Sequence, residues 1–156
     1  MKMLLDKSIS ELAHKLRKRE VTIEQLVSES IKQSEQGRQL NCFISLRDKK
    51  ELLKEAREKD AAMSDDKHLL YGIPFSVKDS YVTKDLPTTS GSKILKDFVS
   101  PYAATVVQKL LDTGAILIGK NNQDSWGHGG SNENSDFGAV KNPWNPQHIS
   151  GGSSGG

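Results

Sequence analysis

The sequence predicts an α/β fold in which a mixed, largely parallel sheet is flanked by helices and preceded by a helical N-terminal cap. Three observations support this. Apolar residues recur at helical spacing through much of the first 65 residues, residues 73–77 alternate as in a strand, and a helical pattern at 106–111 leads into an apolar strand at 115–118. A strand, a helix and a second strand in this order indicate a right-handed parallel crossover.

The two N-terminal helices carry clear start signals. Ser8 with Glu11, and Thr22 with Gln25, form capping boxes in which each residue satisfies a free backbone N–H group of the other. Apolar residues follow each box at helical spacing, and Gly37 is a typical helix stop. We therefore predict helices that begin after Ser8 and after Thr22.

A strand and a third helix complete the cap. The short apolar run at 42–46 suits a strand, and a heavily charged helical pattern begins at Asp48. Its Glu and Lys residues are mixed in sign, which is typical of a solvated surface rather than of a binding face.

Composition restricts the partners and the compartment. Lys and Arg exceed Asp and Glu by 22 to 20, and this excess of +2 gives no electrostatic reason for direct binding of nucleic acid or anionic lipid. Cys42 is the only cysteine, which excludes an internal disulfide and fits a reducing compartment such as the cytosol. The sequence shows no targeting segment or stretch of membrane-spanning length, so we expect a cytoplasmic protein.

Lys78 is a candidate for chemistry because it directly follows the strand at 73–77, where its side chain could reach a cleft. Most lysines in such positions extend to water. A buried lysine kept neutral is costly and is normally retained only at a functional site. Position alone favours the solvated lysine.

The terminal stretch 151–156 reads Gly-Gly-Ser-Ser-Gly-Gly and offers two hydroxyls on a backbone that side chains do not crowd. Such a backbone allows unusual dihedrals and close approach of amide groups to a ligand. The same string is also typical of a flexible linker. Taken alone, it supports both interpretations.

These features occur together in the order of a known family. Residues 72–79 resemble the G-[IV]-P-x-x-[VIL]-K-D strand of the amidase-signature enzymes, and the terminal stretch resembles their G-G-S-S-G-G motif. Between them lie segments similar to T-T-x-x-S at 88–92, to G-A-x-[LIV]-x-G-K at 114–120 and to G-G-S-x-x-N-x-x-F-G at 129–138. The resemblance covers residues 70–156 closely and residues 8–65 in helical layout only.

The resemblance implies the amidase-signature fold, with residues 1–65 as its helical cap and residues 66–156 as the first part of its α/β core. It also implies a Ser-cisSer-Lys triad in which Lys78 is the base and Ser153 relays the proton. The nucleophilic serine would lie downstream of residue 156, so we expect the chain by itself to be inactive. Gly130 and Ser131 would line the substrate pocket.

Within the family, the N-terminal helices and the segment at 129–138 most resemble the A-type subunit of glutamyl-tRNA(Gln) amidotransferase. That resemblance implies glutamine hydrolysis, with ammonia passed to B- and C-type partner subunits for ATP-dependent amidation of Glu-tRNA(Gln). ATP and Mg²⁺ would bind the partner, tRNA would be contacted indirectly, and this chain would hold no cofactor or metal. Residues 123–128 and Asp79-Ser80 depart from the usual pattern of these A-type subunits.

Two alternatives remain. One is a free-standing amidase that hydrolyses a small carboxamide, and the other is a truncated, non-catalytic binding or scaffold piece. Among the remaining polar residues, His128 and His148 do not stand at metal-ligand spacing. Asp124 and Glu133 are interpreted as supporting or loop-fixing groups.

Overall fold

A computed structural model describes residues 3–156, which divide into two compact units. The first comprises the described residues up to Glu35 together with Arg47–Phe75 and Gln108–Ile118. The second comprises Gln36–Leu46, Ser76–Val107 and Gly119–Gly156. The predicted boundary between cap and core near residue 65 stays a prediction.

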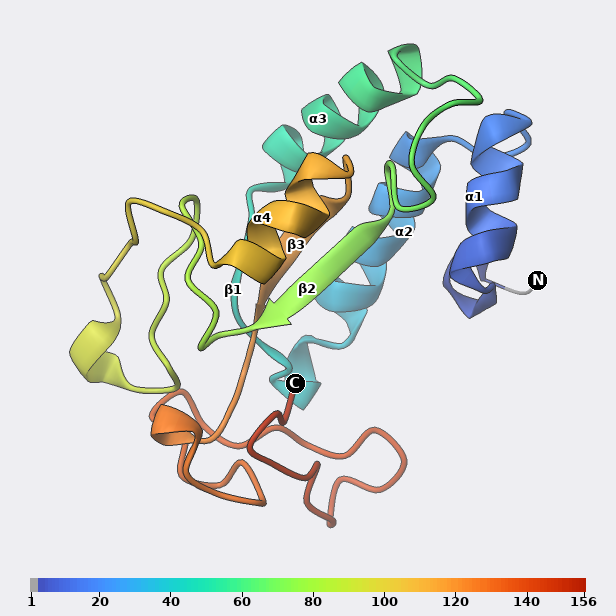
Figure 1. Cartoon of the computed structure of the whole chain (residues 1–156). Coiled ribbons are helices and arrows are strands. Elements are labelled where there is room, and N and C mark those ends of the chain that lie inside the picture. The colour runs from blue at the N-terminus through green and yellow to red at the C-terminus, as the bar shows by residue number, and fades with distance from the viewer. Residues whose placement is uncertain (1–2) are drawn as a thin grey trace. The chain divides into compact units, whose positions relative to one another are not determined.

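Within residues 3–156 the regular structure consists of four α-helices, three strands and four short 3-10 helices, and Figure 1 shows their arrangement. The helices are α1 (Ile9–Arg17), α2 (Ile23–Gln36), α3 (Lys49–Ala61) and α4 (Thr105–Asp112). The strands are β1 (Phe43–Leu46), β2 (Pro74–Lys78) and β3 (Ile116–Asn121). After β3 the chain continues as loops with one short helical turn (Figure 1).

The sheet has the strand order β1-β3-β2 and is mixed, as predicted. β1 is antiparallel to β3, with Phe43 opposite Asn121. On the other side of β3, Ile116 N donates to Ile73 O at 2.9 Å and Asp79 N donates to Asn121 O at 3.1 Å. Residue numbers rise together along this pair, so β2 and β3 are parallel.

Both predicted capping boxes are present in the first unit. Glu11 N donates to Ser8 Oγ at 3.2 Å, and Ser8 N donates back to the Glu11 carboxylate at 2.9 Å. Thr22 and Gln25 make the same reciprocal bonds at 2.9 and 3.0 Å. In addition, the Asp60 carboxylate of α3 accepts the first two backbone N–H groups of α2 at 2.7 and 2.9 Å. A carboxylate at this end of a helix also complements the helix dipole.

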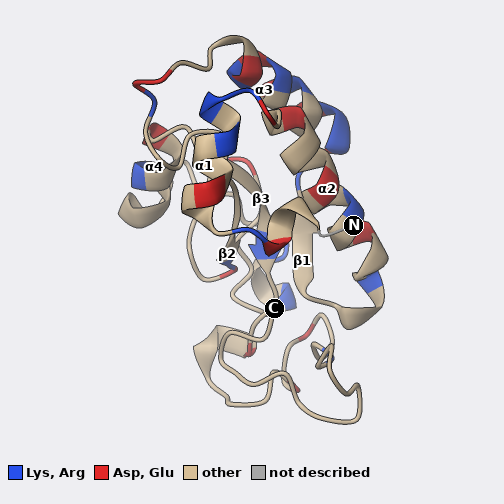
Figure 2. Ribbon diagram, turned by 90° about the vertical axis from the view of Figure 1, so that its right-hand side faces the viewer, with Lys and Arg blue, Asp and Glu red and all other residues tan. Residues whose placement is uncertain are grey.

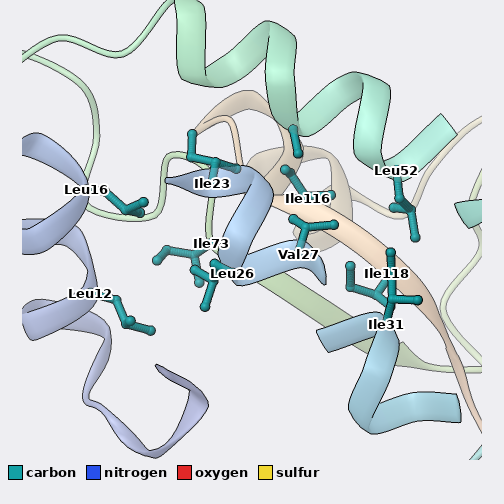
Figure 3. Packing of buried hydrophobic residues seen from close by; sticks show 11 residues of the cluster. Leu12, Leu16, Ile23, Leu26, Val27, Ile31, Leu52, Ile73, Ile116 and Ile118 are labelled. Atoms are coloured by element: carbon teal, nitrogen blue, oxygen red, sulfur yellow. The ribbon is translucent and has the colours of Figure 1, made fainter. Parts of the chain in front are cut away.

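The core of the first unit joins helices and strands. Its buried residues come from α1, α2, α3, the residue directly before β2 and the first half of β3, and Figure 3 shows the side chains converging between these elements. They are Leu12, Leu16, Ile23, Leu26, Val27, Ile31, Leu52, Ala56, Ile73, Ile116 and Ile118. The N-terminal helices therefore bury their apolar faces against the sheet strands of the same unit.

The outer face of α3 is charged and exposed. Figure 2 shows basic and acidic residues mixed along this helix, and only Leu52 and Ala56 are buried. Its ion pair Lys54–Glu58 spans 3.9 Å between largely exposed side chains, which contributes little to stability. The predicted solvated face is confirmed. No helix within residues 3–156 has the length and apolar character needed to cross a membrane.

Leu26 of α2 is fully buried in the core of the first unit, so its truncation should destabilise the fold. We expect Leu26→Ala to lower the free energy of unfolding by about 2–5 kcal/mol, because it removes buried methyl groups and leaves a cavity. Leu69→Ala is the matched control, since Leu69 is 42% exposed. Urea denaturation of both variants measures the difference. Equal effects would contradict the assigned core.

Candidate active site

Lys78 is the last residue of β2 and is half-buried. Its Nζ lies 2.6 Å from Ser153 Oγ, within hydrogen-bond distance. The two residues are 75 positions apart in the sequence. The sequence predicted this contact, and the structure brings the two side chains together in the second unit.

Ser153 stands in the glycine-rich terminal stretch, where the peptide bond between Gly152 and Ser153 is cis. No other residue fits at Gly152. An added Cβ would overlap Asp124 Oδ2 and would lie 2.8 Å from both Gly130 C and Ser131 N. Close backbone approach therefore explains this glycine.

The terminal stretch is anchored by hydrogen bonds rather than hanging free as a linker. Ser153 O accepts a bond from Asp124 N at 3.0 Å, and Ser154 forms an antiparallel bridge with Gln123. The backbone N–H groups of the last two glycines both donate to Asn122 O, at 3.3 and 2.9 Å. Of the two interpretations of this stretch, the structure supports an ordered site segment.

Asp124 fixes the loop beside Ser153. Its side chain is buried, and Oδ1 accepts a bond from Asn132 N at 3.0 Å. Oδ2 is also buried, has no hydrogen-bond partner and faces the position of Gly152. Glu133 is exposed, so the two acids do not form a buried pair. The loop-fixing interpretation is confirmed for Asp124.

Gly130 and Ser131 place their backbone against Gly152, next to the candidate proton relay. Their substrate-binding role stays a prediction. His128 and His148 are both exposed. Residues 3–156 contain no group of three or more His, Cys, Asp or Glu side chains arranged to hold a metal ion.

Asparagine side chains connect the loops of the second unit, a feature that the sequence did not predict. Asn41 Nδ2 donates to the carbonyl oxygens of Phe137 and Gly138 at 3.0 and 2.9 Å. Asn122 Nδ2 donates to Asn41 O at 3.1 Å and to Gly138 O at 2.9 Å. These bonds satisfy loop carbonyls that no strand partner reaches. The abundance of asparagine was the available signal.

A buried ion pair at the sheet ends was also missed. Asp79 directly follows Lys78, and Lys120 lies near the end of β3. Both side chains are fully buried, and Lys120 Nζ stands 3.0 Å from Asp79 Oδ1. Burial lowers the pKa of the Lys120 ammonium, and the nearby carboxylate opposes that shift. The sequence feature that could have predicted this pair is the presence of oppositely charged residues at the ends of two strands that are expected to be neighbours.

The Lys78–Ser153 pair has the elements of a proton relay. A neutral lysine amine can accept a proton, and a serine hydroxyl can both donate and accept one. Ser153 can therefore pass a proton to Lys78 while taking one from another hydroxyl on its far side. Activation of a nucleophile through a hydrogen-bonded base is the general logic of catalytic triads.

The amidase family model matches residues 25–156. The chain belongs to the amidase family. Over 150 residues it is 46% identical to the A-type subunit of the Legionella pneumophila glutamyl-tRNA(Gln) amidotransferase, an alignment that covers 96% of this chain and 31% of the relative. The chain is also 46% identical to the corresponding subunit of Bacillus cytotoxicus. That alignment covers 98% of this chain and 32% of the relative.

Solved structures of the family share this fold. The A-type subunit of the Thermotoga maritima glutamyl-tRNA(Gln) amidotransferase superposes with a TM-score of 0.78 at 31% identity, covering 99% of this chain and 31% of that one. The peptide amidase of Stenotrophomonas maltophilia gives a TM-score of 0.84 at 28% identity, covering 96% and 32%. The chain thus spans about a third of the length of the family members it matches.

The site predicts unequal effects for its two serines. In the chain extended to the length of its relatives, we expect Lys78→Ala and Ser153→Ala each to lower kcat by about 10³-fold or more, because each removes one member of the candidate proton relay. Ser154→Ala should retain most activity, since Ser154 makes no contact with Lys78 in the relay. Steady-state amide hydrolysis measures all three variants.

Circular dichroism provides the folding control for these variants. Near-normal turnover by a folded Lys78→Ala or Ser153→Ala variant would exclude the relay. A larger loss for Ser154→Ala than for Ser153→Ala would show that the wrong serine had been assigned.

Proposed function

We propose that the protein containing this chain is the glutamine-hydrolysing subunit of a glutamyl-tRNA(Gln) amidotransferase. The Lys78–Ser153 contact at 2.6 Å carries the proposal, because it supplies a base and a relay for attack on an amide. The identity of 46% with subunits that bear this name supports the substrate assignment.

The proposed reaction begins when a downstream serine, its hydroxyl deprotonated through Ser153 and Lys78, attacks the side-chain amide of glutamine. Ammonia leaves with the proton returned by the relay, and water then hydrolyses the acyl-enzyme to glutamate. Oxyanion stabilisation, which is worth about 10²–10³-fold in rate per donor, would also come from residues beyond 156. Gly130 and Ser131 would line the pocket.

The proposal assigns the remaining steps to partners. B- and C-type subunits would receive the ammonia and bind ATP, Mg²⁺ and Glu-tRNA(Gln), so that tRNA contacts this chain only indirectly. The net charge of +2 supports this division, because it gives no electrostatic reason for direct binding of a polyanion. The reaction fits a cytoplasmic protein of the translation machinery.

A free-standing amidase is the second candidate. The peptide amidase of Stenotrophomonas maltophilia favours it, because its TM-score of 0.84 exceeds the 0.78 of the Thermotoga maritima protein. A truncated binding or scaffold piece is the remaining alternative, and it requires no chemistry at Lys78.

Partner dependence separates these functions. We expect the chain extended to the length of its relatives to release glutamate from glutamine, and to do so faster when its partner subunits are present. Measurement of glutamate with and without the partners tests this. Partner-independent hydrolysis of other carboxamides would instead identify a free-standing amidase, and no hydrolysis of any amide would leave the scaffold function.

The 156-residue chain provides a further prediction. We expect it to hydrolyse no glutamine, because the proposed nucleophile and oxyanion donors lie outside it. The assay is the same glutamate measurement on the purified chain. Turnover that disappeared in its Lys78→Ala variant would place the nucleophile within residues 1–156.

A further inference from the structure

The Asp79–Lys120 ion pair is isolated from solvent although neither residue belongs to the proposed relay. Both side chains have 0% exposure, and the charged atoms lie 3.0 Å apart. Removing two charges from water costs free energy that their attraction does not always recover. A buried pair of this kind is therefore weak evidence for stability alone, and its position suggests another use.

Asp79 uses nearly all of its polar groups to hold one position. Its N–H group donates to Asn121 O at 3.1 Å, and its carbonyl accepts from Ser90 N at 3.3 Å. Oδ2 accepts from Thr89 N at 2.9 Å and from the Thr89 hydroxyl, while Oδ1 faces Lys120. The residue next to Lys78 is thus fixed by its backbone and by its side chain.

Lys120 connects this fixed point to the loop that follows β2. Its Nζ donates to Thr88 Oγ1 at 2.8 Å and to Pro87 O at 3.3 Å, in addition to facing Asp79. Two of these contacts are hydrogen bonds, and the third is the ion pair with Asp79. Lys120 therefore joins the end of β3, the residue after Lys78 and the 87–90 segment.

The same network reaches the other side of the relay. Ser90, whose N–H group bonds Asp79, accepts a bond at its Oγ from Gln123 Nε2 at 3.1 Å. Gln123 pairs with Ser154, and the next residue, Asp124, holds the Ser153 carbonyl. One continuous set of contacts thus runs from the residue after Lys78 to the residue after Ser153.

We propose that Asp79 and Lys120 are positioning residues that hold the Lys78 amine against Ser153 Oγ. This inference rests on the proposed relay. Asp79 and Lys120 would act on that relay by fixing its position, without touching the substrate. The ion pair fixes the end of β2 through Asp79. The 87–90 segment, through Ser90, fixes Gln123, which pairs with Ser154 next to Ser153. A misplacement of about 1 Å can cost about 10²-fold in rate, so small shifts of Lys78 are enough to matter.

A two-variant comparison separates positioning from stability, using the chain extended to the length of its relatives together with its partner subunits. Lys120→Met leaves a buried carboxylate without its cation, so we expect lower stability and a kcat about 10²-fold lower, with KM within about twofold of wild type. Asp79→Leu/Lys120→Met removes both charges. We expect it to recover thermal stability while kcat stays low, because the Asp79→Leu change removes the carboxylate that accepts both bonds from Thr89.

Thr89→Val is a milder variant that keeps side-chain shape and both charges. It removes the hydroxyl that donates to Asp79 Oδ2 and that accepts a bond from Gly91 N at 3.1 Å, and we expect kcat to fall about tenfold with little change in KM. This variant keeps the proposal testable if Lys120→Met fails to fold. Lys109→Met, at an exposed lysine of α4, is the matched control and should keep wild-type kcat.

The outcomes distinguish three cases. Low kcat with recovered stability in the double variant supports positioning. Recovery of kcat together with stability, or wild-type kcat in Thr89→Val, would show that the pair serves stability only and would overturn the inference. If Lys78→Ala, measured alongside, kept full activity, the proposed relay itself would fail and the positioning role with it.

Discussion

The hydrogen bond between Lys78 Nζ and Ser153 Oγ is the interaction on which the interpretation of this chain depends. Its two residues lie 75 positions apart, at 2.6 Å in the folded chain. A lysine and a serine can reach this geometry only if the end of β2 and the terminal glycine-rich stretch are both held in place. The rest of the fold therefore serves to hold these two short segments, which have few contacts of their own, in fixed positions.

Different physical means hold the two segments. β2 is fixed through its parallel pairing with β3, and Asp79 at its end is fully buried beside Lys120. The terminal stretch has no regular structure of its own. It is held by backbone bonds to residues 122–124 and by the space that glycine leaves beside Asp124. Glycine and asparagine thus provide close approach and side-chain hydrogen bonds where strands are absent.

Local signals allowed much of this arrangement to be predicted from the sequence. The capping residues Ser8 and Thr22 marked two helices, because a cap involves only neighbours in the chain. Lys78 and Ser153 were assigned through family resemblance, since nothing local distinguishes a relay lysine from a solvated one. The Asp79–Lys120 pair was missed for a related reason. Its partners come from neighbouring strands, and their meeting depends on a register that only the folded sheet defines.

The central claim is that Ser153 relays a proton between Lys78 and a serine outside residues 1–156. A crystal structure of the chain extended to the length of its relatives, after reaction with a serine-reactive phosphonate, would test it most directly. We predict phosphorus bonded to a serine beyond residue 156 whose Oγ lies within about 2.6–3.2 Å of Ser153 Oγ, with Lys78 Nζ on the other side of Ser153. Phosphorus on Ser153 or Ser154, or a Lys78 side chain turned away from Ser153, would contradict the account.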